Sequence, residues 1–457
     1  MIGSLTQEEF ARILHAHLRP SSPIQSEEHL YGREAQIQRI NEALYAPGRT
    51  IFIYGDRGVG KTSLAQTVAF AHQSPRHDPI IKACSSRTTF GSLILNIADE
   101  LQGIEIQARA SDTTAKLGYK LPKGLGGAEL ELKRAKHKVE SPDAAAIDLN
   151  DAVALLAHAS AARQGDTVVV VDEFDQISKD SERANFADFI KQLGDQQLGV
   201  RFIFCGVAAS LEKLLGAHKS CYRYIEGVEV AQLSWDARQA IIDGAANALQ
   251  VAVGKHPRYR IAAISDGFPH YVHLVSEKLF WAMFRDPHVR PEPTQEHYHE
   301  AVNAAVLSIE QHLKAAYDAA TMKATSDFED VLWAFADHPE LIRSIDSVYE
   351  SYLEIMRKLN EQPIDRNAFV GHLQALKSPS CGSILASNRR TFYHFRENIL
   401  RGYVRLRAED KGLELARDYY SASLASATST WTPRGARKSR RGMTALDKTR
   451  MNNPQPG

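Results

Sequence analysis

The chain has 457 residues, 44 % of them hydrophobic, and its 55 Lys and Arg balance 55 Asp and Glu. This length predicts two or three domains with hydrophobic cores, and the zero net charge gives no sign of a nucleic-acid or acidic partner. The four cysteines have neither metal-ligand nor disulfide spacing, which favours buried thiols in a reducing compartment. There is no run of about 18 apolar residues and no signal peptide at the start, so we expect a cytoplasmic protein without a membrane partner.

Short helical elements are expected first. Residues 1–27 should form a helix and a linker, because apolar residues recur with helical spacing over 5–18 and a Pro-Ser-Ser-Pro stretch follows them. The tetrapeptide Tyr31-Gly32-Arg33-Glu34 then leads into a helix over 35–44. A Gly-Arg-Glu sequence at this distance before the next motif is typical of the entrance to a nucleotide site, which would place Arg33 over the adenine or near the phosphates.

The next motif is a complete P-loop. An apolar strand over 50–54 runs into Gly55-Asp56-Arg57-Gly58-Val59-Gly60-Lys61-Thr62-Ser63, and a helix begins at Lys61. The glycines let backbone N–H groups approach phosphate oxygens, and the positive end of the helix points at the same phosphates. We therefore expect all nine residues to bind ATP, with Lys61 on the β- and γ-phosphates and the Thr62 hydroxyl on Mg²⁺.

The second half of a nucleotide site follows about a hundred residues later. Four consecutive valines over 168–171 predict a strand buried on both faces, and Asp172-Glu173 ends it. Asp172 is expected to hold Mg²⁺, and Glu173 is expected to be the base for an attacking water. The alternative is that Glu173 is only a surface acid, but the P-loop upstream favours the catalytic interpretation.

Further strands and helices complete an α/β unit over 28–232. Strands are expected at 79–84, 201–207 and 227–230, and helices at 90–101, 149–162, 186–193 and from about Ser210. This alternation predicts a three-layer P-loop NTPase fold with a parallel sheet. A lysine-rich stretch over 103–145 interrupts it, and two interpretations remain open: a solvated insertion, or a β-hairpin that touches a ligand or DNA.

The rest of the chain predicts two smaller parts and a tail. Residues 233–315 should form a helical lid, interrupted at Gly267-Phe268-Pro269. In 326–420 we expect helices over 327–337, 348–359 and 366–376, followed by strands over 391–395 and 403–407. Helices followed by a β-hairpin suggest a winged-helix domain. Residues 421–457 are basic and poor in core residues, which predicts disorder.

On these motifs the chain resembles AAA+ ATPases of the initiator, origin-recognition-like type, and it is also similar to STAND ATPases. The resemblance implies an ATP-dependent homo-oligomer in which Arg223 reaches the γ-phosphate of a neighbouring subunit; a surface salt bridge is the alternative role. Initiators usually carry Asn after the fourth strand, whereas Ser210 stands here, either as a substitute or as a helix cap. The STAND pattern places Pro269 near the adenine, with His270 either on phosphate or in an interface.

The winged-helix resemblance brings in DNA. Basic residues crowd the expected wing, and alternation over 403–407 would put two arginines on one side of a strand. The alternative is a solvated strand packed against the lid. The expected DNA contacts are Arg389, Arg390, Arg396, Arg405 and Arg407.

Two functions are compatible with these patterns. The first is an ATP-hydrolysing switch, with Glu173, Asp172, Lys61 and Arg223 as catalytic residues, that oligomerises and acts on DNA. The second is a STAND-like signalling or scaffolding ATPase whose C-terminal domain binds a protein effector.

Overall fold

The computed structural model describes residues 2–102, 147–162, 167–196, 198–208, 212, 219–322, 327–389 and 391–415. The chain divides into two compact units, residues 23–231 and residues 1–22 together with 232–457. Each unit is described by itself. The stretch 103–145, Ser210, Arg390 and the tail over 421–457 lie outside the described residues, so the predictions made for them stay predictions.

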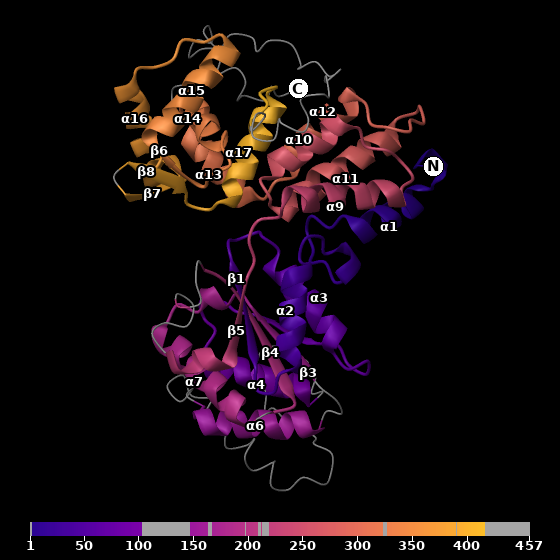
Figure 1. Cartoon of the computed structure of the whole chain (residues 1–457), viewed down its shortest axis with the longest axis vertical. Helices are drawn as coiled ribbons and strands as arrows, with labels where there is room; N and C mark the ends of the chain where they lie inside the picture. Colours follow the sequence, from indigo (N-terminus) through magenta and orange to yellow (C-terminus); the bar gives the residue numbers. More distant parts are fainter. Residues whose placement is uncertain are drawn as a thin grey trace, which may run out of the picture. The chain divides into compact units, whose positions relative to one another are not determined.

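Within the described residues, the unit of residues 23–231 contains a five-stranded sheet of order β2-β3-β4-β1-β5 (Figure 1). All its strand pairs are parallel, and Ile53 of β1 lies between Cys205 of β4 and Val228 of β5. This confirms the predicted α/β fold with a parallel sheet. The strands are β1 (Thr50–Gly55), β2 (Ile80–Ala83), β3 (Thr167–Asp172), β4 (Val200–Val207) and β5 (Ile225–Glu229).

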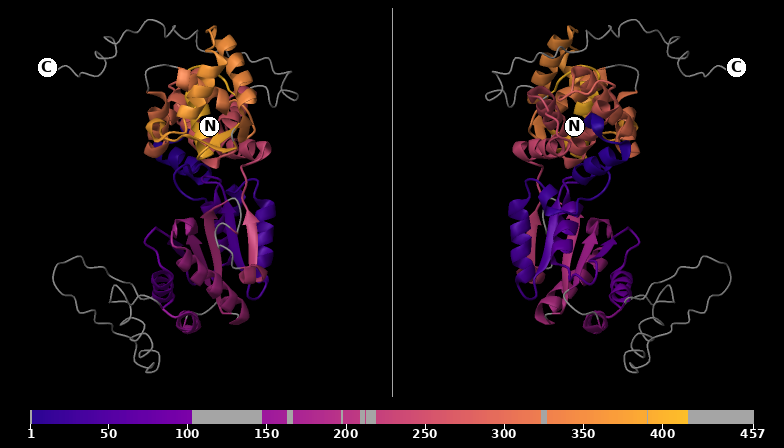
Figure 2. Two further views of the ribbon diagram at one scale, coloured as in Figure 1. Left: turned by 90° about the vertical axis from the view of Figure 1, so that its left-hand side faces the viewer. Right: turned by 90° about the vertical axis from the view of Figure 1, so that its right-hand side faces the viewer.

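Helices cover both faces of this sheet (Figure 2). On one face lie α2 (Glu34–Tyr45) and α3 (Lys61–His72); on the other lie α4 (Phe90–Leu101), α6 (Leu149–Ala162) and α7 (Asp180–Gln196). Because β3 is covered on both sides, Val168 to Val171 are all fully buried, which explains the run of four valines. Aromatic rings fill the second face, where Phe174 meets Phe52 and Phe204 edge-on at 5.4 Å. Short 3-10 turns are η2 (Glu27–His29), η3 (Phe174–Gln176) and η4 (Lys219–Tyr224).

The other unit begins with η1 (Ile2–Ser4) and α1 (Gln7–His17) and continues with α9 (Trp235–Ala248), α10 (Lys255–Ser265), α11 (Pro269–Arg285) and α12 (Gln295–Ser308). A capping box between Thr6 and Glu9 starts α1. Its Phe10 is fully buried, with its ring 4.7 Å from Trp281 and 4.3 Å from Phe284 of α11. The N-terminal helix is therefore held by the aromatic residues of α11.

The same unit continues with helices and a small sheet. The elements are α13 (Gln311–Thr321), α14 (Asp327–Ala336), β6 (Ile342–Ser344), α15 (Ile345–Leu359), α16 (Arg366–Ala375), η5 (Pro379–Cys381), β7 (Leu385–Arg389), β8 (Phe392–Phe395) and α17 (Ile399–Asp410). The sheet is antiparallel with the order β6-β8-β7. None of the helices in the described part of the chain is long and apolar enough to cross a membrane.

The strand expected over 403–407 is wrong, because these residues lie inside helix α17. Five alternating residues cannot distinguish a strand from a helix whose neighbours continue the pattern. Over the whole of α17 the buried apolar residues recur with helical spacing: Ile399, Leu400, Tyr403, Val404 and Leu406.

Helix α17 also buries arginines, which corrects the prediction that Arg405 contacts DNA. Arg405 is 4 % exposed and Arg401 is 1 % exposed. Arg401 donates from Nε and Nη2 to the Asp266 carboxylate at 2.5 and 2.6 Å, and Arg405 Nη1 lies 2.9 Å from the same carboxylate. A guanidinium buried in these bonds cannot reach a DNA phosphate.

Two buried cations share the one carboxylate of Asp266, Asp337 adds a second negative charge near Arg405, and backbone carbonyls accept the remaining hydrogen bonds. The arginines donate to the carbonyls of Ala336, His338, Pro339 and Glu340 after α14, and to Ala263 near the end of α10. Carbonyls at helix C-termini carry partial negative charge. Burial lowers the pKa of Arg405 to about 10, which keeps it charged at neutral pH. The cluster formed by Asp266, Arg401 and Arg405 thus joins α10, α14 and α17.

Candidate nucleotide site

The P-loop lies at the carboxyl end of β1, where its glycines adopt backbone angles that other residues avoid. The φ angles of Gly58 and Gly60 are 81° and 95°, in the left-handed region. A Cβ atom on Gly55 would lie 2.3 Å from the Val230 carbonyl oxygen. The turn therefore depends on glycine both for its conformation and for its close approach to the chain after β5.

Lys61 begins helix α3 and lies inside the P-loop. Its side chain is 8 % exposed, and Nζ donates to the carbonyl oxygens of Asp56 at 2.7 Å and Gly55 at 3.2 Å. Burial lowers the pKa of Lys61, and nearby Cys205, Asp175 and Asp172 partly offset this effect. The ammonium group is thus positioned within the turn whose backbone N–H groups are expected to surround phosphate.

The two predicted Mg²⁺ ligands come together although 110 residues separate them in sequence. The Thr62 hydroxyl donates to Asp172 Oδ2 at 2.6 Å, and Asp172 Oδ1 accepts from the backbone N–H of Glu173 at 2.8 Å. One hydroxyl and one carboxylate fit Mg²⁺, which prefers few protein oxygens completed by water and phosphate. In the described residues there is no group of three or more His, Cys, Asp or Glu that could hold a different metal.

Glu173 has an unusual backbone for a residue with a side chain. Its φ of 53° lies in the left-handed region, which costs energy for any residue with a Cβ and is often found at functional sites. Phe174 next to it is fully buried, whereas Glu173 is exposed. The strained turn thus lets the chain bury Phe174 while Glu173 points into solvent beside Asp172.

A comparison with protein families identifies the region that contains this site. Residues 29–203 match the AAA ATPase domain. The match contains the P-loop, Asp172 and Glu173, and it covers less than half of the chain. A comparison with curated proteins finds no match.

Solved structures resemble the chain over most of its length, at low identity. The Walker-type ATPase of Pyrococcus abyssi is 16 % identical, with 84 % of this chain and 99 % of that chain covered and a TM-score of 0.48. The Aeropyrum pernix ORC2 protein is 13 % identical, with 87 % of this chain and 98 % of that chain covered and a TM-score of 0.45. A variant of Thermotoga maritima RuvB is 15 % identical, with 81 % of this chain and 95 % of that chain covered and a TM-score of 0.41. At these values the similarity assigns neither a function nor a residue role to this chain.

Arg33 is buried and donates hydrogen bonds to the backbone of the P-loop and of the chain after β5. It is 4 % exposed, and its Nη2 donates to the carbonyl oxygens of Val59 at 2.8 Å and Ala231 at 2.7 Å. Burial lowers its pKa to about 10, so it stays charged at neutral pH. One of its terminal nitrogens is thus used by the backbone of the turn, and contact with a nucleotide stays a prediction.

Replacing Arg33 with Met should lower nucleotide affinity roughly tenfold, because buried carbonyl groups left without donors cost about 1–3 kcal/mol and the P-loop would move to regain them. Titration with a fluorescent ATP analogue measures the change. The matched control is Arg39→Met in α2, the helix that Arg33 precedes, since Arg39 is exposed and binds Glu226. Equal affinities for the two variants would contradict a supporting role for Arg33.

The other P-loop residues divide into buried and accessible ones. Val59 is 1 % exposed and packs inward, whereas Arg57 is exposed. The hydroxyl of Ser63 accepts from the backbone N–H of Ile24 at 3.2 Å. Ser63 therefore anchors the incoming chain, and its predicted contact with nucleotide stays a prediction.

Asp175 is a residue of the site to which sequence reasoning gave no role. Its Oδ1 accepts from the backbone N–H of Val207 at 2.8 Å, which ties the turn after β3 to the end of β4. Asp175 also lies close enough to Lys61 to affect its pKa. The one sequence signal for a role of Asp175 is its position two residues after Glu173. Only the sheet order, in which β4 lies beside β3, shows that Asp175 bonds to the end of β4.

Arg223 lies at the amino end of the parallel strands, opposite the carboxyl end that carries the P-loop of the same chain. It precedes β5, whose first residue Ile225 pairs with Thr50, the first residue of β1. The five steps from Thr50 to Gly55 along β1 separate the two ends of the strand by about 17 Å, at 3.3 Å per residue. Arg223 is exposed, and at this distance it cannot reach a phosphate held by the same chain.

Pro269 and His270 belong to the unit that contains α11. Pro269 begins this helix, a position in which its missing N–H costs nothing. His270 Nδ1 lies 3.0 Å from the Pro20 carbonyl oxygen, and because a carbonyl only accepts, Nδ1 carries the hydrogen. His270 Nε2 is buried and has no hydrogen-bond partner among the described residues. In neutral His270 it is an acceptor, so a contact with phosphate requires the protonated ring.

The remaining predicted DNA contacts differ in exposure. Arg389 and Arg396 are exposed, and Arg396 Nε donates to the Ser383 carbonyl at 2.9 Å. Arg407 is half-buried, with its guanidinium 5.5 Å from the centre of the Tyr317 ring. Of this set, Arg389 and Arg396 are therefore the accessible cations among the described residues.

Proposed function

We propose that this chain is an ATP-hydrolysing switch whose nucleotide state controls assembly and DNA binding. The observation that carries the proposal is the contact between Thr62 and Asp172, with Glu173 beside them. A metal-binding hydroxyl, a metal-binding carboxylate and a second exposed carboxylate are the groups needed to bind ATP·Mg²⁺ and to orient an attacking water. Lys61 supplies the positive charge for the β- and γ-phosphates.

The proposed assembly rests on the place of Arg223. This arginine cannot serve its own nucleotide because it lies at the amino end of the strands. An arginine supplied by a neighbouring subunit stabilises the charge of the transition state and is worth about 10³–10⁵ in rate in enzymes that use one. We infer that Arg223 completes the site of a second copy, which makes hydrolysis depend on assembly.

The proposed DNA-binding part is a winged helix formed by α14 to β8. Its element order, three helices with a three-stranded antiparallel sheet, supports this assignment. Helix α16 exposes Arg366, Asn367 and Gln374, side chains that can hydrogen-bond to base edges or phosphates. Arg389 and Arg396 on the β-hairpin add two accessible cations.

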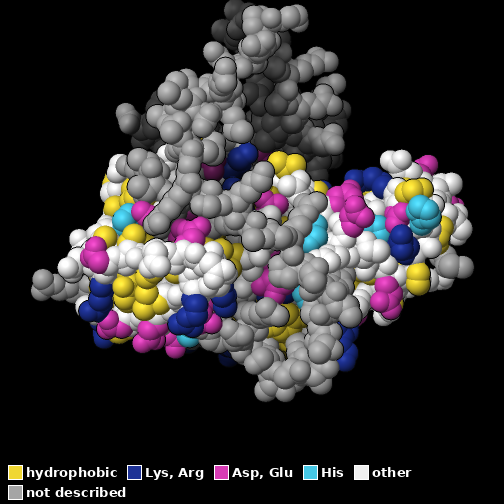
Figure 3. All heavy atoms as spheres, turned by 90° about the horizontal axis from the view of Figure 1, so that it is seen from above, with side chains coloured by type: hydrophobic (Ala, Val, Ile, Leu, Met, Phe, Trp, Pro, Cys, Tyr) yellow, Lys and Arg dark blue, Asp and Glu magenta, His cyan; other side chains and the backbone are white. Residues whose placement is uncertain are grey.

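One observation favours the alternative, a module that binds a protein effector. Arg401 and Arg405 are buried, so they add no charge to the surface. On the face seen in Figure 3, Lys and Arg side chains are interspersed with Asp and Glu rather than gathered in one patch. On this face electrostatic attraction to DNA would come from few residues, and a protein partner suits such a mixed face better.

Anisotropy of fluorescent duplex DNA distinguishes the two functions. We expect Glu173→Gln to bind DNA roughly tenfold more tightly with ATP than with ADP, a typical coupling between two sites. Arg389→Ala should reduce the slope of log affinity against log salt by about 0.9, the value for one phosphate contact. Arg290→Ala is the matched control, since Arg290 is exposed and pairs with Asp286. Absence of DNA binding in either nucleotide state would favour the effector-binding module.

A further inference from the structure

Arg223 is held by a chain of side chains at the edge of the sheet. Its guanidinium lies 4.6 Å from the centre of the Tyr224 ring, and its Nη2 donates to the Tyr224 hydroxyl at 2.5 Å. The Tyr224 hydroxyl in turn donates to Asp195 Oδ1 at 2.5 Å. Asp195 lies near the end of α7, so an element far away in sequence sets the position of Arg223.

Two glycines make room for this arrangement. A Cβ atom on Gly194 would lie 2.1 Å from the Tyr224 ring, and one on Gly48 would lie 2.5 Å from the Gly194 carbonyl oxygen. Gly48 also has a φ of 71°. The loop before β1, the end of α7 and the ring of Tyr224 are therefore in close contact, and neither glycine can be enlarged without moving a neighbour.

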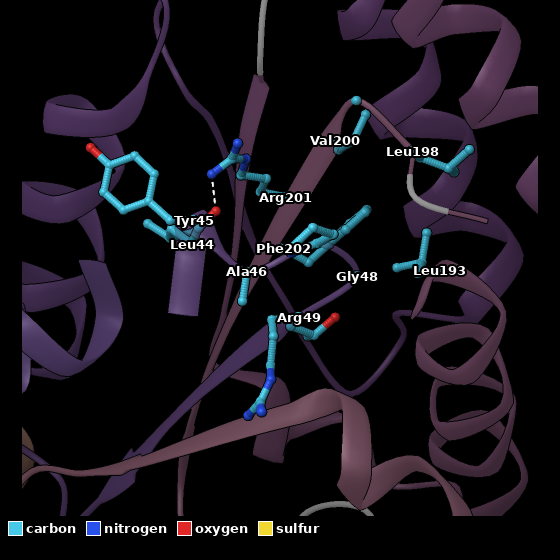
Figure 4. A pocket seen from close by; sticks show the side chains of 13 residues that line it. Leu44, Tyr45, Ala46, Gly48, Arg49, Leu193, Leu198, Val200, Arg201 and Phe202 are labelled. Carbon is cyan, nitrogen blue, oxygen red and sulfur yellow. Dashed lines mark hydrogen bonds between the residues drawn. The ribbon is translucent and has the colours of Figure 1, made fainter. Parts of the chain in front are cut away.

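The loop before β1 and the segment from the end of α7 to the start of β4 border a pocket of about 260 Å³ (Figure 4). Gly48, Arg49, Leu193 and Leu198 are among the residues that line it. Gly48 thus lies between this pocket and Gly194, and the Tyr224 ring packs partly buried against the core that α7 helps to form. The close approach of Gly194 to the ring and the hydroxyl bond to Asp195 together position Tyr224, and with it Arg223.

We propose that Tyr224 and Asp195 are positioning residues that hold Arg223 ready for the γ-phosphate of a neighbouring copy, and that Gly194 is needed because Tyr224 lies against it. The inference rests on the proposed role of Arg223 in a second subunit. A free arginine samples many rotamers, whereas a guanidinium fixed on a ring and a hydroxyl keeps one direction before the subunits meet. An isolated surface ion pair would restrict the arginine side chain much less.

The experiment mixes two full-length variants and measures ATP turnover. Lys61→Ala cannot bind ATP but supplies Arg223, and Arg223→Ala binds ATP but supplies no arginine. Each alone should be nearly inactive, and their mixture should recover turnover at the interfaces between them. Tyr224→Phe is then added to either chain, which separates a role in the donated arginine from a role in the chain that binds ATP.

We expect Tyr224→Phe to lower the recovered turnover about tenfold when it is in the Lys61→Ala chain, the value of one charge-assisted hydrogen bond. In the Arg223→Ala chain it should have no effect. Equal loss in both positions would mean a general structural role, and no loss in either would mean that Arg223 needs no support; both outcomes overturn the inference. Mixtures that recover no turnover would overturn the role of Arg223 itself and the inference with it.

Alanine substitutions at Gly194 and at Gly199 provide the second test. Gly194→Ala in the Lys61→Ala chain should lower the recovered turnover as Tyr224→Phe does, because its methyl group displaces the ring. Gly199→Ala is the matched control, since no atom lies within 4 Å of a Cβ at this position. If Gly194→Ala retained the turnover of Gly199→Ala, the proposed contact would not govern Arg223.

Discussion

Replacing Glu173 with Gln should lower kcat for ATP hydrolysis by a factor of about 10²–10⁴, the usual contribution of a general base. The amide cannot accept a proton from the attacking water. Affinity for ATP should stay within about twofold, since Lys61, Thr62 and Asp172 are unchanged and general-base catalysis acts on the chemical step. Single-turnover hydrolysis and equilibrium nucleotide binding measure the two quantities separately.

The control for this variant is Gln176→Ala, an exposed residue of the same turn. It should leave both quantities unchanged. A Glu173→Gln protein with the turnover of the wild type would show that another group activates the water, and Glu173 would then be a surface acid. A fall in ATP affinity as large as the fall in kcat would indicate that the strained turn after β3 had changed.

Asp266→Asn should destabilise the unit that contains α17 by about 3 kcal/mol or more, because removing one partner of a buried ion pair leaves uncompensated charge. Asp266 is 5 % exposed and forms ion pairs with both Arg401 and Arg405. Asn keeps the size of the side chain and tolerates the φ of 53° at this position. The loss can therefore be assigned to charge rather than to the backbone.

Tryptophan fluorescence during urea unfolding measures this effect in the correct unit. The four tryptophans are Trp235, Trp281, Trp333 and Trp431, and none lies in residues 23–231. The matched control is Asp243→Asn, whose partner Arg258 forms a more exposed pair and which should cost less than about 1 kcal/mol. Equal stabilities for the two variants would show that the Asp266 cluster contributes no more than a surface ion pair.

The sequence by itself predicted the candidate nucleotide site, because its signals are local. A glycine-rich turn before a helix and two carboxylates after a buried strand carry their chemistry within a few residues. The buried valines and the alternation of strands and helices also predicted the parallel sheet. Local patterns of this kind need no knowledge of what packs against them.

Only the tertiary structure decided where the charged residues of the C-terminal part lie. In sequence, Arg405 and Arg407 look like one face of a strand, but α17 buries Arg405 against Asp266 and the carbonyls after α14. Arg33 is a similar case, since its carbonyl partners Val59 and Ala231 lie far apart in the sequence of its unit. An arginine carries the same charge whether it is buried or exposed. Its partners come from elements that are distant in sequence, which no short sequence pattern contains. Burial and pairing of ionic groups depend on contacts distant in sequence, whereas phosphate-binding turns depend on neighbouring residues, and this difference separates what could be predicted from what could not.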